Sequence, residues 1–320
     1  MNKIFNTLEF IKQMIKFSPR QGENEQKAAE FIVSVLKKYK IPLALQNFKT
    51  SIPLIKKVRL TADGQTLNCA GASFVSGRIE GKENIVSSLV ISDECARLPN
   101  INFSPKSEFV SRPSFYYAPA IAVDRRGLKK ILQADKISGD VKVGPFAFDS
   151  SNILAGNAAD PKIIIFAHYD SIETGATDNA SGTAVMMDTI IKYPETLKFV
   201  LYVFAGNEEL SYDKPTYWGR GYRAFEKKNR KIMERCKNII VVDSLGNGKT
   251  RVDQNPELMH LAFPIINMNE WKNKITLICG DMEKLMKVYH SQKDDLRQIS
   301  AKCLEESSQI LIMQIHERSV

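Results

Sequence analysis

The second half of the chain alternates apolar runs with segments of helical periodicity. The apolar runs occupy residues 163–167, 199–205, 239–242 and 276–279. Helices are expected near residues 182–192, 222–235 and 282–288, followed by a long final helix from about 295 toward 315. Buried strands that alternate with helices are typical of a sheet covered by helices on both faces. The pattern predicts an α/β fold with a mixed, mostly parallel twisted sheet.

The N-terminal segment carries two further helical patterns. The first, near residues 3–17, ends at Ser18-Pro19, and the second extends from about Glu23 to Tyr39 before Pro42. Proline removes a backbone donor and disfavours helical geometry in the residue before it, so both patterns end where proline follows. The chain is therefore expected to begin with two helices.

Between about residues 50 and 150 the pattern changes to short β-like runs, such as 120–123, separated by Gly, Pro and Ser. One short helix is expected near residues 128–133. A chain of 320 residues is long enough for one large domain and a smaller one. We expect a discontinuous α/β domain and an inserted, mostly β domain, with bounds 1–48 plus 151–320 and 49–150, respectively.

Composition narrows the possible partners. Hydrophobic residues make up 43% and charged residues 25%, as in folded proteins with a sizeable core. The formal charge of +9 could serve nucleic-acid binding, but the densest basic stretch, residues 227–231, has no interleaved aromatic residue. This stretch is predicted to be an exposed helix face. No nucleic-acid partner is expected, although a basic nucleic-acid-binding protein is kept as a distant alternative.

The N-terminal and cysteine patterns bear on where the protein resides. Lys12 and Lys16 interrupt the apolar spacing at the N-terminus, which lacks a signal-peptide pattern. The sequence has no apolar run near the ~18 residues that a membrane span needs. Its five cysteines never take CxxC spacing, which argues against a thiolate zinc site. These features predict a cytoplasmic protein without a membrane partner.

Polar residues follow the apolar runs of the predicted sheet. The chain continues with His168-Tyr169-Asp170 after the first run, with Gly206-Asn207-Glu208-Glu209 after the second, and with Asp243 after the third. A glycine-bounded loop holds Asp178, and a second histidine, His290, follows the last strand and helix. Ligands in α/β sheets bind beyond the carboxyl ends of the strands. We expect these side chains to share one edge of the sheet.

Such a set of side chains favours a metal site. Each motif alone has an ordinary structural explanation: His168 as a core residue, the Asp178 loop as a helix N-cap, and Asp243 as part of a turn. Their joint placement changes this, because carboxylates crowded in a cleft stay ionised when a cation is present. Imidazole and carboxylate ligands favour zinc, cobalt or manganese. Two histidines and three carboxylates suffice for two ions about 3.5–4 Å apart, as in two-metal hydrolases.

Five motifs resemble, in order and spacing, those of the dinuclear zinc aminopeptidase family, which includes bacterial leucyl aminopeptidases, glutaminyl cyclases and glutamate carboxypeptidase II. They are His168-Tyr169-Asp170, Asp178-Asn179-Ala180-Ser181-Gly182, Asn207-Glu208-Glu209, Asp243-Ser244-Leu245-Gly246, and Tyr289-His290-Ser291 with Asp294. The resemblance covers roughly residues 1–45 and 150–320. Residues 119–124 and 151–155 also look like the end of a short protease-associated insert.

The resemblance implies a zinc-exopeptidase fold and two divalent metal ions, most simply Zn²⁺, with Co²⁺ or Mn²⁺ as options. His168 and Asp243 would bind one ion, Glu209 and His290 the other, and Asp178 would bridge them. It further implies that Asp170 orients His168 and that Glu208 is the general base acting on a metal-bridged water. A cis peptide bond is expected between Asp178 and Asn179.

The activity implied is that of an aminopeptidase, whose substrates are peptides with a free N-terminus. Cyclase-like or carboxypeptidase chemistry and a non-catalytic binding domain remain alternatives, and the oligomeric state is open. One departure from the family pattern bears on specificity. Residues 210–218 stand where relatives have a short Gly-Leu-x-Gly-Ser turn, and Tyr212, Tyr217 and Trp218 in this loop either shape a substrate pocket or pack the loop.

Overall fold

The computed structural model describes residues 5–89 and 97–319. The chain divides into two compact units. Unit 1 comprises Met1–Thr50, Phe148–Leu285 and Asp294–Val320, and unit 2 comprises Ser51–Ala147 and Met286–Lys293. Residues 286–293 were expected in the α/β domain, whereas in the structure they group with unit 2.

A mixed sheet forms the centre of unit 1. Its strand order is β12-β13-β11-β9-β10-β8-β1. These strands are β12 (Arg251–Asp253), β13 (Ile275–Cys279), β11 (Asn238–Asp243), β9 (Ile163–His168), β10 (Val200–Ala205), β8 (Ile137–Gly156) and β1 (Leu43–Ala62). The four strands from β13 to β10 are parallel, and β12 and β8 pair antiparallel with their neighbours β13 and β10. The α/β fold with a mixed sheet is therefore confirmed.

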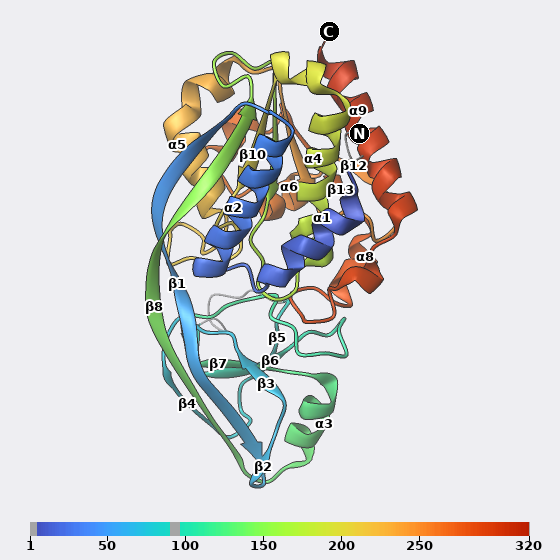
Figure 1. Cartoon of the computed structure of the whole chain (residues 1–320). Helices are drawn as coiled ribbons and strands as arrows, with labels where there is room; N and C mark the ends of the chain where they lie inside the picture. The colour runs from blue at the N-terminus through green and yellow to red at the C-terminus, as the bar shows by residue number, and fades with distance from the viewer. Residues whose placement is uncertain (1–4, 90–96, 320) are drawn as a thin grey trace. The chain divides into compact units, whose positions relative to one another are not determined.

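Helices cover both faces of this sheet. Figure 1 shows four of them together on one side: α1 (Thr7–Met14), α2 (Glu23–Lys38), α4 (Gly182–Lys192) and α9 (Ala301–Ser319). The other face packs against α5 (Arg220–Arg235), α6 (Pro256–Ala262) and α7 (Met268–Trp271). Along β9, Ile163 and Ile165 join the first core, and Ile164 and Phe166 join the second. Burial on both faces explains why this strand is a continuous apolar run.

The first and the last helix begin later than the sequence pattern predicts. Helix α1 begins at Thr7, where the Asn6 side chain accepts from the Glu9 N–H at 2.9 Å, and residues 3–4 lie outside the described residues. The final helix, expected from about 295, begins at Ala301. It is preceded by a short 3₁₀ turn (Leu296–Gln298) and by Ile299 in extended geometry.

Unit 2 is mostly β, as predicted for the smaller domain. A four-stranded sheet has the order β3-β7-β6-β5, formed by β3 (Cys69–Gly71), β7 (Ala120–Val123), β6 (Asn100–Phe103) and β5 (Ile85–Ser87). β4 (Gly77–Glu80) pairs with β8, and β2 (Gln65–Thr66) pairs with β1. Helix α3 (Arg125–Gln133) packs its Ile131 into a core with Ile121 and Val123. A short helix, α8, spans Met282–Met286 near the end of the unit 1 segment.

The described residues bear on two sequence predictions, which concern membrane-spanning helices and the cysteines. None of their helices combines the length and the apolar character required to cross a membrane. Four cysteines within the described residues carry free thiols, whereas Cys95 lies outside those residues.

Candidate metal centre

Three adjacent parallel strands end at the same edge of the unit 1 sheet. His168 is the last residue of β9 and pairs in register with Ala205, the last residue of β10. Asp243 ends the next strand, β11. This register brings the residues that follow β9 and β10 next to the end of β11. The structure thus places the predicted polar residues of unit 1 at one edge.

The imidazole of His168 lies among carboxylates. Its Nε2 is 3.2 Å from Asp178 Oδ1 and 3.7 Å from Asp243 Oδ1, and its Nδ1 is 3.4 Å from Asp170 Oδ1. His168, Asp170 and Asp178 are buried, whereas the Asp243 side chain is 19% exposed. One ring nitrogen therefore faces the predicted orienting carboxylate, and the other faces two predicted metal ligands.

The carboxylate of Asp170 also organises the Glu208-Glu209 pair. Its Oδ1 accepts from the Glu208 N–H at 3.0 Å, and its Oδ2 accepts from the Glu209 N–H at 2.9 Å. Asn207, just before the pair, takes a positive φ of 50°. Because both N–H groups bind one carboxylate, the backbone turn that carries the two glutamates is held next to His168.

The loop that carries Asp178 is held to the end of β11. The Asn179 side chain donates to the Val242 carbonyl at 2.9 Å and accepts from the Gly182 N–H at 3.0 Å. A Cβ at Gly182 would lie 2.3 Å from the Asn179 side-chain oxygen, so a larger residue does not fit there. Asp294 accepts from the Asp178 N–H at 3.0 Å. The peptide bond between Asp178 and Asn179 is cis, as the family resemblance predicts.

Burial and like charges shape the electrostatics of this edge. Burial raises the pKa of Glu208 well above its usual value, and the nearby Glu209 carboxylate raises this pKa further. Burial alone would lower the pKa of His168, but hydrogen bonds with Asp170 and Asp178 more than compensate and raise it well above its usual value. Several ionised carboxylates in one buried cluster repel one another, and a bound cation stabilises such a cluster.

The donor set at this edge fits a metal ion. His168, Asp178 and Glu209 each offer a ligand atom, and these three atoms lie within 4.8 Å of one another in buried positions. One imidazole with two carboxylates suits zinc, cobalt or manganese. The His168 Nδ1 lies 3.4 Å from Asp170 Oδ1, and a carboxylate in this position would fix the tautomer of a metal-binding histidine.

A family model decides the assignment of this part of the chain. Residues 152–252, which contain four of the five predicted motifs, match the model described as Peptidase family M28. Over these residues the chain is similar to peptidase family M28. The chain is therefore a metallopeptidase, a hydrolase of peptide bonds, and the resemblance noted in the sequence is confirmed.

Solved structures share the fold of this chain across nearly its whole length. A zinc aminopeptidase from Bacillus subtilis has 17% identity and a TM-score of 0.69, with 97% of this chain and 94% of that chain covered. An aminopeptidase from Aneurinibacillus sp. strain AM-1 has 16% identity and a TM-score of 0.58, with 95% and 92% covered. A glutaminyl cyclase from Porphyromonas gingivalis has 14% identity and a TM-score of 0.52, with 98% and 97% covered. No curated protein sequence matches the chain.

His290, the second histidine predicted to bind metal, belongs to unit 2. Its Nδ1 lies 3.0 Å from the Arg112 carbonyl oxygen, and the Arg112 N–H donates to the His290 carbonyl at 3.2 Å. The Tyr289 ring stacks on the imidazole, with 3.7 Å between centroids. A carbonyl can only accept, so it favours a proton on Nδ1, and the neutral ring then has its lone pair on Nε2. The role of His290 as a ligand stays a prediction.

The loop of residues 210–218, which departs from the M28 pattern, is packed by its own residues. The Trp218 Nε1–H donates to the Leu261 carbonyl at 3.0 Å, and the Tyr217 ring lies edge-on to Trp218 with 5.0 Å between centroids. The Ser211 N–H donates to the Tyr217 carbonyl at 2.6 Å. For Tyr217 and Trp218, these contacts favour the loop-packing alternative over a lining of the substrate pocket.

Arg20 is a buried cation behind the candidate centre, and the sequence did not predict its role. Arg20 is 0% exposed and donates from Nε to the Tyr169 carbonyl at 2.5 Å and from Nη2 to the Gly175 carbonyl at 2.8 Å. Burial lowers the pKa of Arg20 to about 10, so it remains charged at neutral pH. Arg20 joins the turn between α1 and α2 to the loops on either side of Asp170 and Asp178. No local pattern around residue 20 marks this role, because its partners are about 150 residues away.

Glu25 is a second buried charged residue that the sequence analysis missed. It is 0% exposed, its Oε1 accepts from the Ser150 hydroxyl, and it lies next to Gly206 at the start of the glutamate turn. Burial raises the pKa of Glu25 well above its usual value, and the Asp170 carboxylate raises it further. Glu25 therefore keeps its proton to a higher pH than an exposed glutamate does.

Proposed function

We propose that this metallopeptidase is an exopeptidase that removes N-terminal residues from peptides, with two divalent metal ions, most simply Zn²⁺. One observation carries the proposal: buried ligand atoms of His168, Asp178 and Glu209 lie within 4.8 Å of one another, beside a further buried carboxylate, Glu208. The aminopeptidases with the same fold support the choice of reaction.

The proposed ligand set follows the family resemblance. His168 and Asp243 would hold one ion, Glu209 and His290 the other, and Asp178 would contact both. Bound ions of this kind lower the pKa of water and polarise a carbonyl group. His290 belongs to unit 2. We propose that unit 2 is a short protease-associated-like insert.

The proposed catalytic residues are Glu208 and Asp170. Glu208 would take a proton from the attacking water and pass it to the leaving amine, which requires a carboxylate beside the ligands but free of direct ligation. Its neighbour Glu209 has its N–H on the same Asp170 carboxylate, so the two side chains leave one backbone turn. Asp170 would keep both the His168 ring and this turn in place.

Aminoacyl anilides with free and with acetylated N-termini test the proposal. We expect the metal-loaded protein to cleave only the free substrates, to lose this activity on chelation and to regain it when zinc is returned. Cleavage of the acetylated substrates at a similar rate would contradict an aminopeptidase.

Glutaminyl cyclase activity is the second candidate, because a cyclase shares the fold over 98% of this chain. A peptide with N-terminal glutamine separates the two activities: a cyclase releases ammonia and leaves the peptide bond intact, whereas an aminopeptidase releases free glutamine. Absence of turnover with all substrates would favour a non-catalytic binding domain. A cytoplasmic location and the absence of nucleic-acid binding stay predictions of the sequence.

A further inference from the structure

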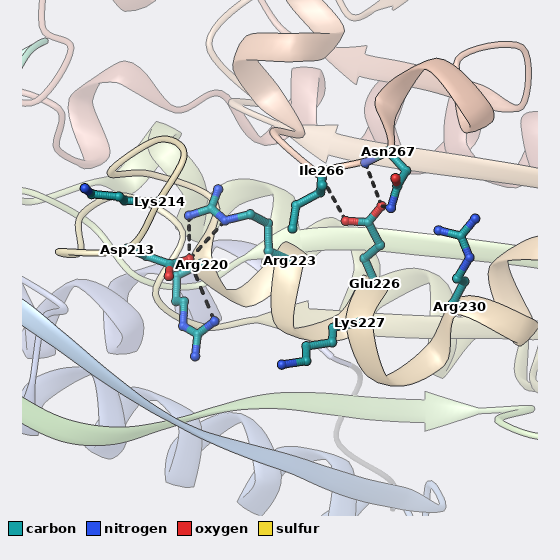
Figure 2. A pocket seen from close by; sticks show the side chains of 9 residues that line it. All are labelled: Asp213, Lys214, Arg220, Arg223, Glu226, Lys227, Arg230, Ile266 and Asn267. Carbon is teal, nitrogen blue, oxygen red and sulfur yellow. Dashed lines mark hydrogen bonds and ion pairs between the residues drawn. The ribbon is translucent and has the colours of Figure 1, made fainter.

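A hollow in unit 1 lies between helix α5, the loop of residues 210–218 and the segment at residues 266–267 (Figure 2). Its volume is about 390 Å³, within the range of small-molecule pockets of about 300–1,000 Å³. Five of its nine lining residues are basic and two are acidic. We call it the α5 pocket; its lining residues are Asp213, Lys214, Arg220, Arg223, Glu226, Lys227, Arg230, Ile266 and Asn267.

Four of the basic residues belong to one face of α5. Arg220, Arg223, Lys227 and Arg230 follow one another at intervals of three, four and three residues, which is the spacing of side chains on one helix face. Figure 2 shows Arg220 and Lys227 extending to the same side of the helix. This face therefore concentrates positive charge along one wall of the α5 pocket.

The two acidic residues do not neutralise that wall. Asp213 Oδ2 accepts from Arg223 Nε at 3.0 Å and Nη2 at 2.9 Å, so it is paired with this one buried guanidinium. Glu226 is 2% exposed and accepts from the N–H groups of Ile266 at 2.8 Å and Asn267 at 2.9 Å. Both carboxylates are thus occupied in building the floor of the pocket.

Two of the five cations are also occupied. Besides Asp213, Arg223 donates to the carbonyls of Trp218 at 2.6 Å and Pro264 at 3.1 Å. Arg230 pairs with Glu234 at 3.1 Å, and with Glu270 as well. These two arginines hold the walls together, and an incoming ligand would meet the remaining cations.

Arg220 and Lys227 remain for a ligand. Arg220 is 27% exposed, and its Nη1 is 3.7 Å from Asp213, a carboxylate that Arg223 already binds more closely. Its Nη2 donates to the Lys49 carbonyl at 3.1 Å, and its guanidinium group lies over the Phe48 ring, which fixes its position beside the pocket. Lys214 and Lys227 are exposed, and within residues 5–89 and 97–319 neither ammonium group forms an ion pair with a carboxylate. Cations gathered around one hollow repel one another, and an anion in it relieves that repulsion.

We propose that the α5 pocket binds a small, multiply charged anion through a phosphate group, which Arg220 and Lys227 contact. A guanidinium group binds two phosphate oxygens at once, and a lysine ammonium group adds a point charge beside them. A phosphate group carries up to two charges on one centre, which matches two cations on the same side of the helix better than a single carboxylate does. The proposal does not depend on the proposed peptidase function.

Calorimetric titration of the full-length, metal-loaded protein with pyrophosphate and with inorganic phosphate tests the proposal. We expect saturable binding of pyrophosphate with one site at this pocket. Lys227→Gln should weaken that binding by about tenfold, since it removes one charge-assisted contact. The Lys227 side chain is exposed, so the fold is retained.

The matched control is Lys228→Gln, an exposed neighbour on α5 that does not line the pocket. We expect this variant to bind pyrophosphate as the wild type does. Equal weakening by Lys228→Gln, or the absence of saturable binding, would overturn the proposal. So would binding that chelation abolishes and Lys227→Gln leaves intact, because the anion would then occupy the metal centre. Tighter binding of glutamyl-glutamate than of pyrophosphate would overturn the choice of phosphate.

Discussion

Unit 1 contains two charged sites of opposite sign, and they differ in how the protein holds the charge. The candidate metal centre gathers buried carboxylates around His168, and Asp178 there is 6% exposed. The α5 pocket gathers cations, of which Lys214 and Lys227 are exposed. Water stabilises exposed charges at little cost, whereas buried charges require a partner. We therefore expect a bound cation to stabilise the first site, whereas an anion is an optional occupant of the second.

The segment of residues 210–219 has contacts at both sites. The Gly219 N–H donates to the Glu208 carbonyl at the metal centre, whereas Asp213 binds Arg223 at the α5 pocket. The metal centre is backed by the buried residues Arg20 and Glu25, and the α5 pocket by the buried residues Arg223 and Glu226. Substitutions at the metal centre should therefore affect activity and stability much more strongly than substitutions of exposed residues elsewhere in unit 1.

The largest effect is expected for Glu208→Gln. Glutamine keeps the size of the side chain but cannot take a proton, so turnover of a free aminoacyl anilide should fall by about 10²–10⁴-fold. Metal content should stay unchanged, as measured by elemental analysis of the same sample. Glu257→Gln, an exposed residue on α6, serves as the control and should keep full turnover. Full turnover of Glu208→Gln would contradict its assigned role.

Arg20→Met is expected to destabilise the protein by about 3–5 kcal/mol, since removing one member of a buried charged network leaves its partners without compensation. The Tyr169, Thr174 and Gly175 carbonyls would lose a donor. Chemical denaturation of metal-free wild type and variant measures the difference. Arg20→Lys, which keeps the charge without the forked geometry, should lie between the two. A loss below about 1 kcal/mol for the methionine variant would show that these loops do not depend on Arg20.

Asp294→Asn is expected to cost about 1–3 kcal/mol. The two oxygens of Asp294 accept from the Thr177 N–H at 2.9 Å and the Asp178 N–H at 3.0 Å. Asparagine can accept only one of these bonds and leaves the other N–H buried without its acceptor. Denaturation of the metal-free proteins provides the measurement, and Asp295→Asn is the neighbouring control. Equal stability of Asp294→Asn and the wild type would argue against this support of the Asp178 loop.

The smallest effect is expected for Glu25→Gln, and it should depend on pH. Burial raises the pKa of Glu25, so the folded protein keeps this proton while the unfolded chain releases it above about pH 4.5. The contribution of Glu25 to stability is therefore greatest below that pH and declines as pH rises toward the folded-state pKa. Denaturation of metal-free protein at pH 5 and pH 8 should show the variant gaining stability relative to the wild type. A difference that does not change with pH would contradict a raised pKa of Glu25 in the folded protein.

The parts of the centre that the sequence predicts are local in the chain. His168, the Glu208-Glu209 pair and Asp243 each follow an apolar run, and parallel strands bring such positions to one edge. The Asp178 loop was recognisable because one short motif carries both the proposed ligand Asp178 and the residues Asn179 and Gly182, whose contacts hold the loop in place. For the same reason the α/β strands were predicted closely, since their apolar runs reflect burial on both faces.

The parts that the sequence did not predict depend on long-range contacts. Arg20 and Glu25 act on residues more than 100 positions away. Grouping of residues 286–293 with unit 2 follows from tertiary packing, which no local pattern records. The basic stretch at residues 227–231 was predicted to be an exposed helix face, which holds for Lys227 and Lys228. Arg223 and Glu226, which build the pocket floor beneath that face, could be recognised only from their contacts.

Metal content per chain tests the central claim most directly. Wild-type protein and Asp178→Ala, dialysed side by side against the same zinc buffer, should differ sharply under elemental analysis. The account predicts about two ions per wild-type chain, in line with two-metal hydrolases, and none in the variant, because Asp178 is the proposed ligand of both. A wild-type chain without metal, or an Asp178→Ala variant that retains two ions, would contradict a metal centre at this edge of the sheet.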